Sequence, residues 1–158
     1  MSSQLANGKE ADRKMVVTLP KGEYQKLLSH AISCLPEEAC GLIAGRIEKN
    51  RKRIEKVYLL PNTDHSSEHF SISPQDQLNA IRDMRKSGLQ PLGNWHSHPQ
   101  TPSRPSEEDK RLAYDPSASY LILSLAEREP ILRAFAISGN MAVQEELTIE
   151  EDNTSWMN

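Results

Sequence analysis

The chain has 158 residues, 37% of them hydrophobic, and its formal net charge at pH 7 is −3. This length fits one domain, and the scatter of the basic residues argues against nucleic acid as a partner. No apolar run approaches the ~18 residues that a membrane-spanning helix needs, and the two cysteines are too few for a disulfide framework. Since the start of the sequence also lacks a signal-peptide pattern, we expect no membrane association and a cytoplasmic location.

Both ends of the chain are polar. We predict a flexible N-terminal tail over residues 1–14, a single domain over residues 15–149 and a flexible C-terminal tail over residues 150–158. The segment from Glu145 onward looks poorly suited to a core. The basic run at residues 49–53 is interpreted as a solvated turn between two strands.

Apolar periodicity and turn residues predict that strands alternate with helices. One helix has clear boundaries, with Ser73 as its cap, Pro74 in its first turn and Gly88 after its end. This order of elements favours an α/β fold in which helices flank a mixed, largely antiparallel β-sheet. Helices are predicted over residues 21–35, 74–86 and 106–114, and strands over residues 15–19, 38–45, 53–60, 92–98, 120–125, 131–137 and 143–149, with a short extended piece at 70–72.

Two histidines separated by one residue stand at the end of the strand predicted over residues 92–98. On a strand, His96 and His98 point to one face, about 7 Å apart at the backbone, so that both can bind one ion. A proline-rich turn then leads to Ser106 and, one helical turn later, to Asp109. Two imidazoles and one carboxylate leave a fourth tetrahedral position open, as a catalytic zinc site requires.

Each of these features also has a structural explanation. Histidines at this spacing are often ordinary side chains of a surface or a core, and Ser106 with Asp109 forms a capping box for the helix that follows. Cys40 is predicted to be a small buried hydrophobic residue rather than a metal ligand. Trp95 alternates to the opposite face and is expected in the core. The other histidines, His30, His65 and His69, are expected to be exposed.

In combination the motifs are more specific. The run from His96 to Asp109 has the form H-x-H-x7-S-x-x-D, and the run from Glu38 to Gly45 resembles the segment E-x-C-G-x-L-x-G. Both motifs are typical of the JAMM/MPN zinc metallopeptidases, which the chain resembles from about residue 16 to residue 143. The resemblance implies a cytidine-deaminase-like JAMM/MPN domain that binds Zn²⁺ through His96, His98 and Asp109.

The resemblance also implies roles for two further residues. Glu38 is expected to be the general base, which takes a proton from water and passes it to the leaving amine. Glu37 is the poorer candidate, because the family places the acid two residues before the Cys-Gly pair. Ser106 is expected to hydrogen-bond the oxyanion of the tetrahedral intermediate, a role that one hydroxyl can combine with helix capping.

The compact motif resembles the bacterial branch of the family, because Asp109 is followed by the next predicted strand with no room for a long insertion. Members of this branch resemble hydrolases that act at the Gly-Gly C-terminus of small ubiquitin-like sulfur carriers, and some release cysteine. We therefore expect a peptidase that cleaves after such a tail. Residues 99–105 and residues 61–69 are predicted to wall the channel that holds the tail.

Three other functions fit the sequence to different degrees. An isopeptidase that removes a ubiquitin-like modifier from lysine needs the same zinc, base and channel. A non-catalytic MPN scaffold that only binds partners typically loses a ligand, and none is missing here. A zinc nucleobase deaminase needs H-x-E and P-C-x-x-C motifs, and the chain has neither. The sequence gives neither the oligomeric state nor the identity of the carrier.

Overall fold

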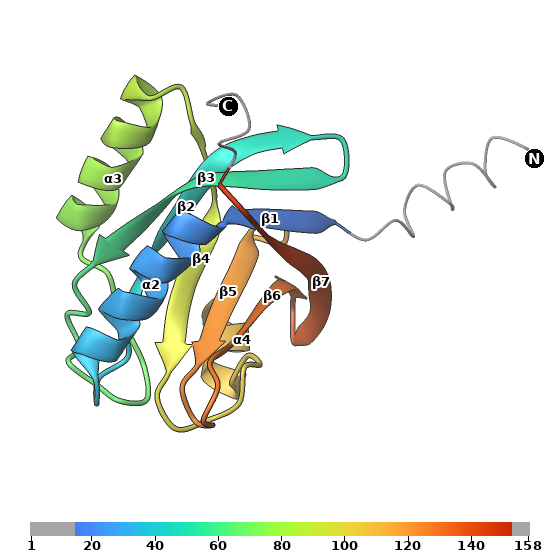
Figure 1. Cartoon of the computed structure of the whole chain (residues 1–158). Helices are drawn as coiled ribbons and strands as arrows, with labels where there is room; N and C mark the ends of the chain where they lie inside the picture. Colours follow the sequence, from blue (N-terminus) through green and yellow to red (C-terminus); the bar gives the residue numbers. More distant parts are fainter. Residues whose placement is uncertain (1–14, 153–158) are drawn as a thin grey trace, which may run out of the picture.

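The computed structural model describes residues 15–152. Within them, seven strands and three helices follow one another in the predicted alternation (Figure 1). The strands are β1 (Val16–Pro20), β2 (Cys40–Glu48), β3 (Arg51–Leu60), β4 (Gln90–His98), β5 (Ser119–Ser124), β6 (Ile131–Ser138) and β7 (Met141–Glu150), and the helices are α2 (Lys21–Cys34), α3 (Pro74–Lys86) and α4 (Glu107–Leu112).

The strands form one sheet in the order β1-β3-β2-β4-β5-β6-β7, which closes into a barrel where β7 pairs with β1. The pairs β1–β3, β1–β7 and β4–β5 are parallel, and the other four pairs are antiparallel. The predicted mixed, largely antiparallel sheet with flanking helices is confirmed. Closure was not predicted, because it depends on pairing between the first and last strands of the chain.

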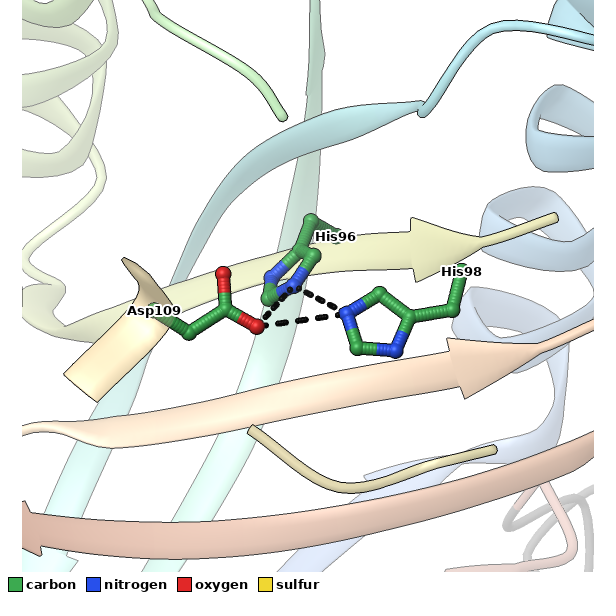
Figure 2. A group of neighbouring side chains, drawn as sticks. All are labelled: His96, His98 and Asp109. Atoms are coloured by element: carbon green, nitrogen blue, oxygen red, sulfur yellow. Dashed lines mark hydrogen bonds and ion pairs between the residues drawn. The ribbon is translucent and has the colours of Figure 1, made fainter. Parts of the chain in front are cut away.

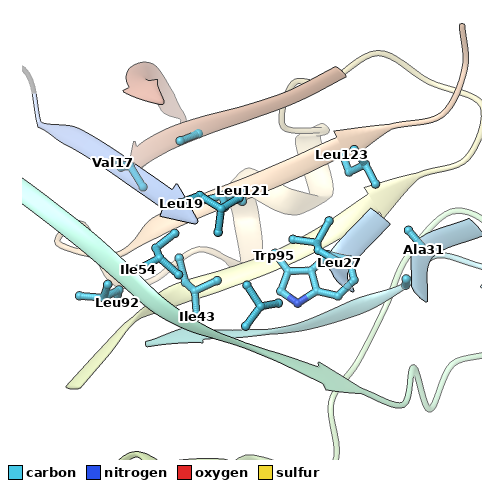
Figure 3. Packing of buried hydrophobic residues seen from close by; sticks show 13 residues of the cluster. Val17, Leu19, Leu27, Ala31, Ile43, Ile54, Leu92, Trp95, Leu121 and Leu123 are labelled. Carbon is cyan, nitrogen blue, oxygen red and sulfur yellow. The ribbon is translucent and has the colours of Figure 1, made fainter. Parts of the chain in front are cut away.

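The main core lies on the side of the sheet that α2 covers (Figure 3). Trp95 of β4 is fully buried there, as its alternation with the neighbouring histidines predicted, and its Nε1–H donates to the carbonyl oxygen of Tyr58 (3.0 Å). Leu27 and Ala31, one helical turn apart on α2, complete this core from the helix. The remaining members are Val17, Leu19, Ala39, Ile43, Ile54, Val57, Leu92, Leu121, Leu123 and Ala134.

A second, smaller cluster holds α3 against the other side of the sheet. Ala80 and Met84 of α3 pack there against Ala44 and Tyr58. Asp83 of the same helix accepts hydrogen bonds from Lys56 Nζ (2.7 Å) and from the Tyr58 hydroxyl (2.6 Å). The helix has the predicted bounds, and the Ser73 side chain caps it by accepting from the Asp76 N–H (3.1 Å). Helix α3 therefore forms a fixed wall beside β2 and β4.

Two local segments differ from the regular structure around them. Residues 70–72, expected to be a short extended piece, join no strand of the sheet, because Ser71 pairs with Asn62 and Thr63 of the same loop. The basic run at residues 49–53 is not a solvated turn: the turn is limited to residues 49–50, and Lys52 on β3 is buried. Lys52 Nζ donates to the carbonyl oxygen of Ser117 and to Ser119 Oγ (2.9 Å), so burial is compensated by hydrogen bonds.

The last strand also differs from expectation. Glu145 is buried within β7, where its Oε1 accepts from Ser119 Oγ (2.7 Å), so the chain from this residue onward does contribute to the interior. Beyond β7, Glu151 lies 3.2 Å from Lys21 Nζ, and the Asp152 carboxylate accepts from the Gly22 N–H (3.3 Å). Of the predicted tails, residues 1–14 and residues 153–158 lie outside the described residues, while Glu150 at the start of the predicted C-terminal tail (150–158) belongs to β7. No helix within residues 15–152 has the length and apolar character needed to cross a membrane.

Candidate metal centre

Three side chains from two elements meet at the end of β4 (Figure 2). His96 and His98 occupy alternate positions on this strand and point to the same side, while Asp109 extends from the first turn of α4. The Nε2 atoms of His96 and His98 lie 3.0 Å apart, and Asp109 Oδ2 lies 3.2 Å from each of them. Both histidines are buried, and Asp109 is partly buried. The structure thus brings together the three predicted ligands.

The triangle of donor atoms fits a tetrahedral zinc ion. Zinc binds imidazole nitrogen and carboxylate oxygen at about 2.0–2.1 Å, which sets the ligand atoms of a regular tetrahedron about 3.3 Å apart. The three observed separations of 3.0, 3.2 and 3.2 Å are close to this value. Three protein donors leave one corner of the tetrahedron open, as in catalytic zinc sites.

Neighbouring groups fix the orientation of the two imidazoles. His98 Nδ1 lies 2.9 Å from the carbonyl oxygen of Pro102, which can only accept, so this nitrogen carries the proton and Nε2 presents its lone pair to the centre. The Phe70 ring stacks on His96, with the ring centroids 4.7 Å apart. Burial lowers the pKa of His96, although Asp109 opposes this shift, and a neutral imidazole is the form that binds a metal.

Helix α4 delivers the carboxylate. Ser106 caps the helix: its Oγ accepts from the Asp109 N–H (3.0 Å), and Asp109 Oδ2 accepts from the Ser106 N–H (2.9 Å). The predicted capping box is therefore present, and the same box aims Asp109 at the histidines. Although burial acts to raise it, the close approach of His96 and His98 and the hydrogen bond from the Ser106 N–H hold the pKa of Asp109 well below its usual range, so the ligand is an anion.

Glu38 lies directly opposite His98 across the sheet. In the antiparallel β2–β4 ladder, Cys40 pairs with His96. The Ser97 N–H donates to the Ala39 carbonyl oxygen (3.0 Å), so these two residues form the next pair. The same register places Glu38 opposite His98. The side chain is 3% exposed, and its Oε1 has no hydrogen-bond partner within residues 15–152. Burial raises the pKa of Glu38 to about 8, with the charge of His98 acting in the opposite direction.

Two residues that hold Glu38 in place were not predicted. Ser97, between the two histidines, accepts at its Oγ from the Ala39 N–H (2.8 Å) and is fully buried. Asn62 donates through its Nδ2 to the carbonyl oxygens of Glu38 and His69 (3.1 Å each), which ties the loop after β3 to the centre. The role of Ser97 follows from the pairing of β2 with β4, and that of Asn62 follows from the folding of the loop after β3, so no local sequence pattern indicates either role.

A family model described as prokaryotic homologs of the JAB domain matches residues 20–138. This chain belongs to the prokaryotic JAB family. The membership confirms the resemblance to the bacterial branch of the JAMM/MPN proteins that the two sequence motifs indicated. It also agrees with the arrangement of His96, His98 and Asp109 described above.

Relatives of this JAB protein include solved structures and named enzymes. The solution structure of protein DSY2949 from Desulfitobacterium hafniense has a TM-score of 0.81 and 49% identity, and the match covers 90% of this chain and 98% of that one. A CysO-cysteine peptidase from Mycobacterium tuberculosis is 30% identical over 128 residues, which is 79% of this chain and 85% of the relative. A probable TtuB-protein conjugate cleaving protease from Thermus thermophilus is 33% identical over 96 residues, 60% of this chain and 62% of the relative.

A cavity of about 370 Å³ opens beside the metal centre of the JAB domain, and His96 and Asp109 are part of its lining. Phe70 and Ile72 line it from the segment before α3, and residues 112–114 line it from the segment after α4. Residues 99–105 and residues 61–69, which were predicted to wall the substrate channel, do not line this cavity.

Both of these segments instead support the residues of the centre. The Pro102 carbonyl oxygen orients His98, and the Ser103 hydroxyl donates to the carbonyl oxygen of Ile122 (2.6 Å). The other segment folds around Asn62, which holds the backbone of Glu38. Their hydrogen bonds thus point toward the centre rather than into the cavity.

The remaining histidines and cysteines of the JAB domain do not join the centre. His65 and His69 are exposed, as predicted, and His69 Nδ1 lies 2.9 Å from Asp64 Oδ2. His30 is half-buried rather than exposed, because the edge of its ring meets Trp95 at 6.2 Å between centroids. Cys40 is buried as expected, and burial raises the pKa of its thiol to about 12, which disfavours the thiolate that a metal ligand requires.

Proposed function

We propose that this JAB-family protein is a zinc-dependent peptidase that hydrolyses the bond after the C-terminal Gly-Gly of a small ubiquitin-like sulfur carrier, releasing cysteine or another amine. The observation that carries the proposal is the triangle of His96, His98 and Asp109 with Glu38 directly opposite His98. Three ligands with an open fourth position and an adjacent buried carboxyl form the minimum set for hydrolysis assisted by a metal.

The chemistry divides between the ion and the protein. His96, His98 and Asp109 would hold the zinc ion, which would supply Lewis acidity, lowering the pKa of water toward ~7 and polarising a carbonyl oxygen. Glu38 accepts a proton from the attacking water, whose oxygen bonds to the carbonyl carbon, and returns that proton to the nitrogen as the C–N bond breaks. The second proton of the water leaves the new carboxylic acid and is taken up by the amine, so the products are a carboxylate on the carrier and an ammonium group.

Ser106 supplies the remaining group. Its Oγ accepts from the Asp109 N–H, which leaves the serine its own hydroxyl proton to donate. A hydrogen bond from this hydroxyl to the developing oxyanion strengthens as negative charge builds up in the transition state.

The names of the relatives support the substrate class. The relative from Mycobacterium tuberculosis is named for the adduct CysO-cysteine, and the one from Thermus thermophilus for TtuB-protein conjugates. The first name describes a peptidase for a cysteine adduct and the second a protease for a protein conjugate, which supports a conjugate as the substrate class. The second name favours an alternative for the same site, an isopeptidase that releases a ubiquitin-like modifier from a protein.

A cleavage assay tests the proposal. A carrier–cysteine adduct with a Gly-Gly tail is incubated with the enzyme, and an adduct with a Gly-Ala tail serves as the control. Both reactions are run with and without a chelator, and the products are identified by mass spectrometry. We expect loss of cysteine from the Gly-Gly adduct alone, and only without the chelator. Equal cleavage of both tails, or cleavage that resists the chelator, would contradict the proposal. Cleavage of a lysine-linked conjugate alone would establish the isopeptidase alternative.

A further inference from the structure

The cavity beside the metal centre is a groove that runs along β4. On its floor, Leu42 of β2 and Tyr120 of β5 flank Asn94 of β4 as direct strand partners, and all three line the cavity. His96 marks one end of the groove. The other end reaches Ile47, which lies beyond the last residue of β2 that pairs with β4. From His96 to the start of β4 at Gln90 the strand advances six residues, about 20 Å.

This length and shape suit an extended peptide. The groove is walled on one side by Phe70 and Ile72 and on the other by residues 112–114. A chain of about six extended residues fits along 20 Å of strand, because each residue advances by about 3.3 Å. A peptide that lies in the groove with its scissile carbonyl at the metal centre therefore runs beside β4 and over Asn94.

Asn94 is a polar group on a largely apolar floor. Its neighbours there are Leu42, Tyr120 and Ile122. The Asn94 Oδ1 atom is buried and has no hydrogen-bond partner among the residues that the structure describes. Buried amide groups in folded proteins normally have a partner, and a carboxamide can present either its oxygen or its NH₂ by rotation about χ2. A bound peptide backbone offers both the donor and the acceptor that such a group can use.

We infer that Asn94 is a positioning residue for the substrate tail, which it holds through a hydrogen bond to the tail backbone about two residues before the scissile bond. Asn94 and His96 are two residues apart on one face of β4. An extended peptide beside them advances by nearly the same distance per residue, so the peptide residue beside Asn94 lies about two residues from the one beside His96. A contact to backbone rather than to a side chain suits a tail of glycines. This inference rests on the proposed function and adds a residue to it.

The competing explanation is that Asn94 stabilises the irregular backbone of β4. The register shifts just before it, and Gly93 has a φ of +152° with no room for a side chain against the Ser119 carbonyl oxygen. A structural asparagine would bond a nearby backbone group, and replacing it would destabilise the fold. The two explanations therefore predict opposite changes in stability.

Two variants, Asn94→Leu and Asn94→Ala, test the inference beside a matched control. Asn79→Leu makes the same change on the exposed face of α3, where Asn79 contacts Gln75. With the Gly-Gly carrier adduct, we expect KM to rise by about three- to tenfold in both Asn94 variants, as for one lost neutral hydrogen bond, while kcat stays within about twofold. The melting temperature of Asn94→Leu should be unchanged or higher, and the zinc content of all variants should equal that of the wild type.

A binding measurement separates this inference from the proposed function. A free peptide that ends in Gly-Gly is titrated into chelator-treated protein, and its Kd is read from NMR shifts. We expect Kd to rise by about three- to tenfold in both Asn94 variants and to stay unchanged in Asn79→Leu. An unchanged Kd and KM, or a loss of binding that only accompanies a lower melting temperature, would overturn the role of Asn94. If the wild type binds the peptide but cleaves no adduct, the proposed function fails and the Kd comparison still decides the role of Asn94.

Discussion

Two carboxyl groups stand at the candidate metal centre, and their surroundings give them different properties. Asp109 contacts two imidazoles and accepts a hydrogen bond from the Ser106 N–H, and these neighbours keep it ionised. Glu38 is enclosed with one oxygen unpartnered, so burial raises its pKa to about 8. A divalent cation nearby would lower that pKa again, because opposite charge favours the carboxylate. The first group is suited to hold a cation and the second to exchange protons.

The replacement Glu38→Gln tests this division of roles. The amide keeps the shape of the side chain but cannot accept a proton, so we expect kcat to fall by at least ~10²–10⁴-fold while zinc content and melting temperature are retained. The neighbouring Glu37→Gln is the matched control and should keep wild-type turnover. Near wild-type hydrolysis by Glu38→Gln would show that another residue is the base.

The sequence predicted which residues form the centre, but not how residues from different strands lie relative to one another. Strand alternation placed His96 and His98 on one face, and the capping-box spacing placed Asp109 in the first turn of a helix. The position of Glu38 opposite His98 depends on the register between β2 and β4, which no local pattern encodes. For the same reason Ser97 and Asn94 were not singled out, since their contacts are made across the sheet.

At the scale of elements, α4 has two functions in one short helix. Its cap residue Ser106 both starts the helix and lies beside the ligand Asp109. Its C-terminal end and the residues after it, 112–114, form one wall of the groove. The helix is only six residues long, so its stability depends strongly on the capping box.

The variant Ser106→Ala separates capping from catalysis. Loss of a cap alone costs about 1 kcal/mol of stability and leaves kcat unchanged. As an oxyanion donor, Ser106 should instead contribute ~10²–10³-fold to kcat, and we expect that loss together with a modest drop in melting temperature. Ser73→Ala is the control, because Ser73 caps α3 in the same way and should show the drop in stability alone. If kcat at saturating substrate is equal in the two variants, Ser106 is only a cap.

Elements with strong local signals were predicted closely, and connecting segments were not. Helix α3 has its predicted bounds because Ser73, Pro74 and Gly88 define its ends without help from the rest of the fold. The two loops that were predicted to wall the channel do not line the cavity beside the centre, because proline-rich and polar loops can face either way. Their side chains and carbonyls turn toward His98 and Glu38 rather than into the groove.

The whole molecule is held together by closure of the barrel, and one buried polar network lies where the last strand completes it. Lys52 on β3, Ser119 on β5 and Glu145 on β7 are joined through the Ser119 hydroxyl. Sequence analysis assigned Lys52 to a solvated turn and Glu145 to a polar end, because charged residues are seldom buried unless they are paired. The partners of both residues lie far away in the chain, so no local pattern could reveal them.

This network predicts a pH dependence of stability. Burial raises the pKa of Glu145 above its ordinary value of 4.5, against the opposing effects of Ser119 and Lys52. Above about pH 4.5 the unfolded chain releases a proton that the folded chain keeps, so this contribution to the free energy of unfolding falls as the pH rises. In Glu145→Gln the contribution is absent. Urea unfolding of both proteins between pH 4 and 7 should therefore show the wild type losing stability relative to the variant as the pH rises. A constant difference across this range would contradict the assignment.

The central claim is that His96, His98 and Asp109 bind one catalytic zinc ion, and elemental analysis of purified variants tests it most directly. We predict about one zinc per chain in the wild type and in His65→Ala, which removes an exposed histidine outside the centre, and strongly reduced zinc in His98→Ala and Asp109→Ala. Loss of one of three protein ligands leaves two, which is too few for tight binding. Full zinc occupancy in His98→Ala, at the level of His65→Ala, would contradict the claim.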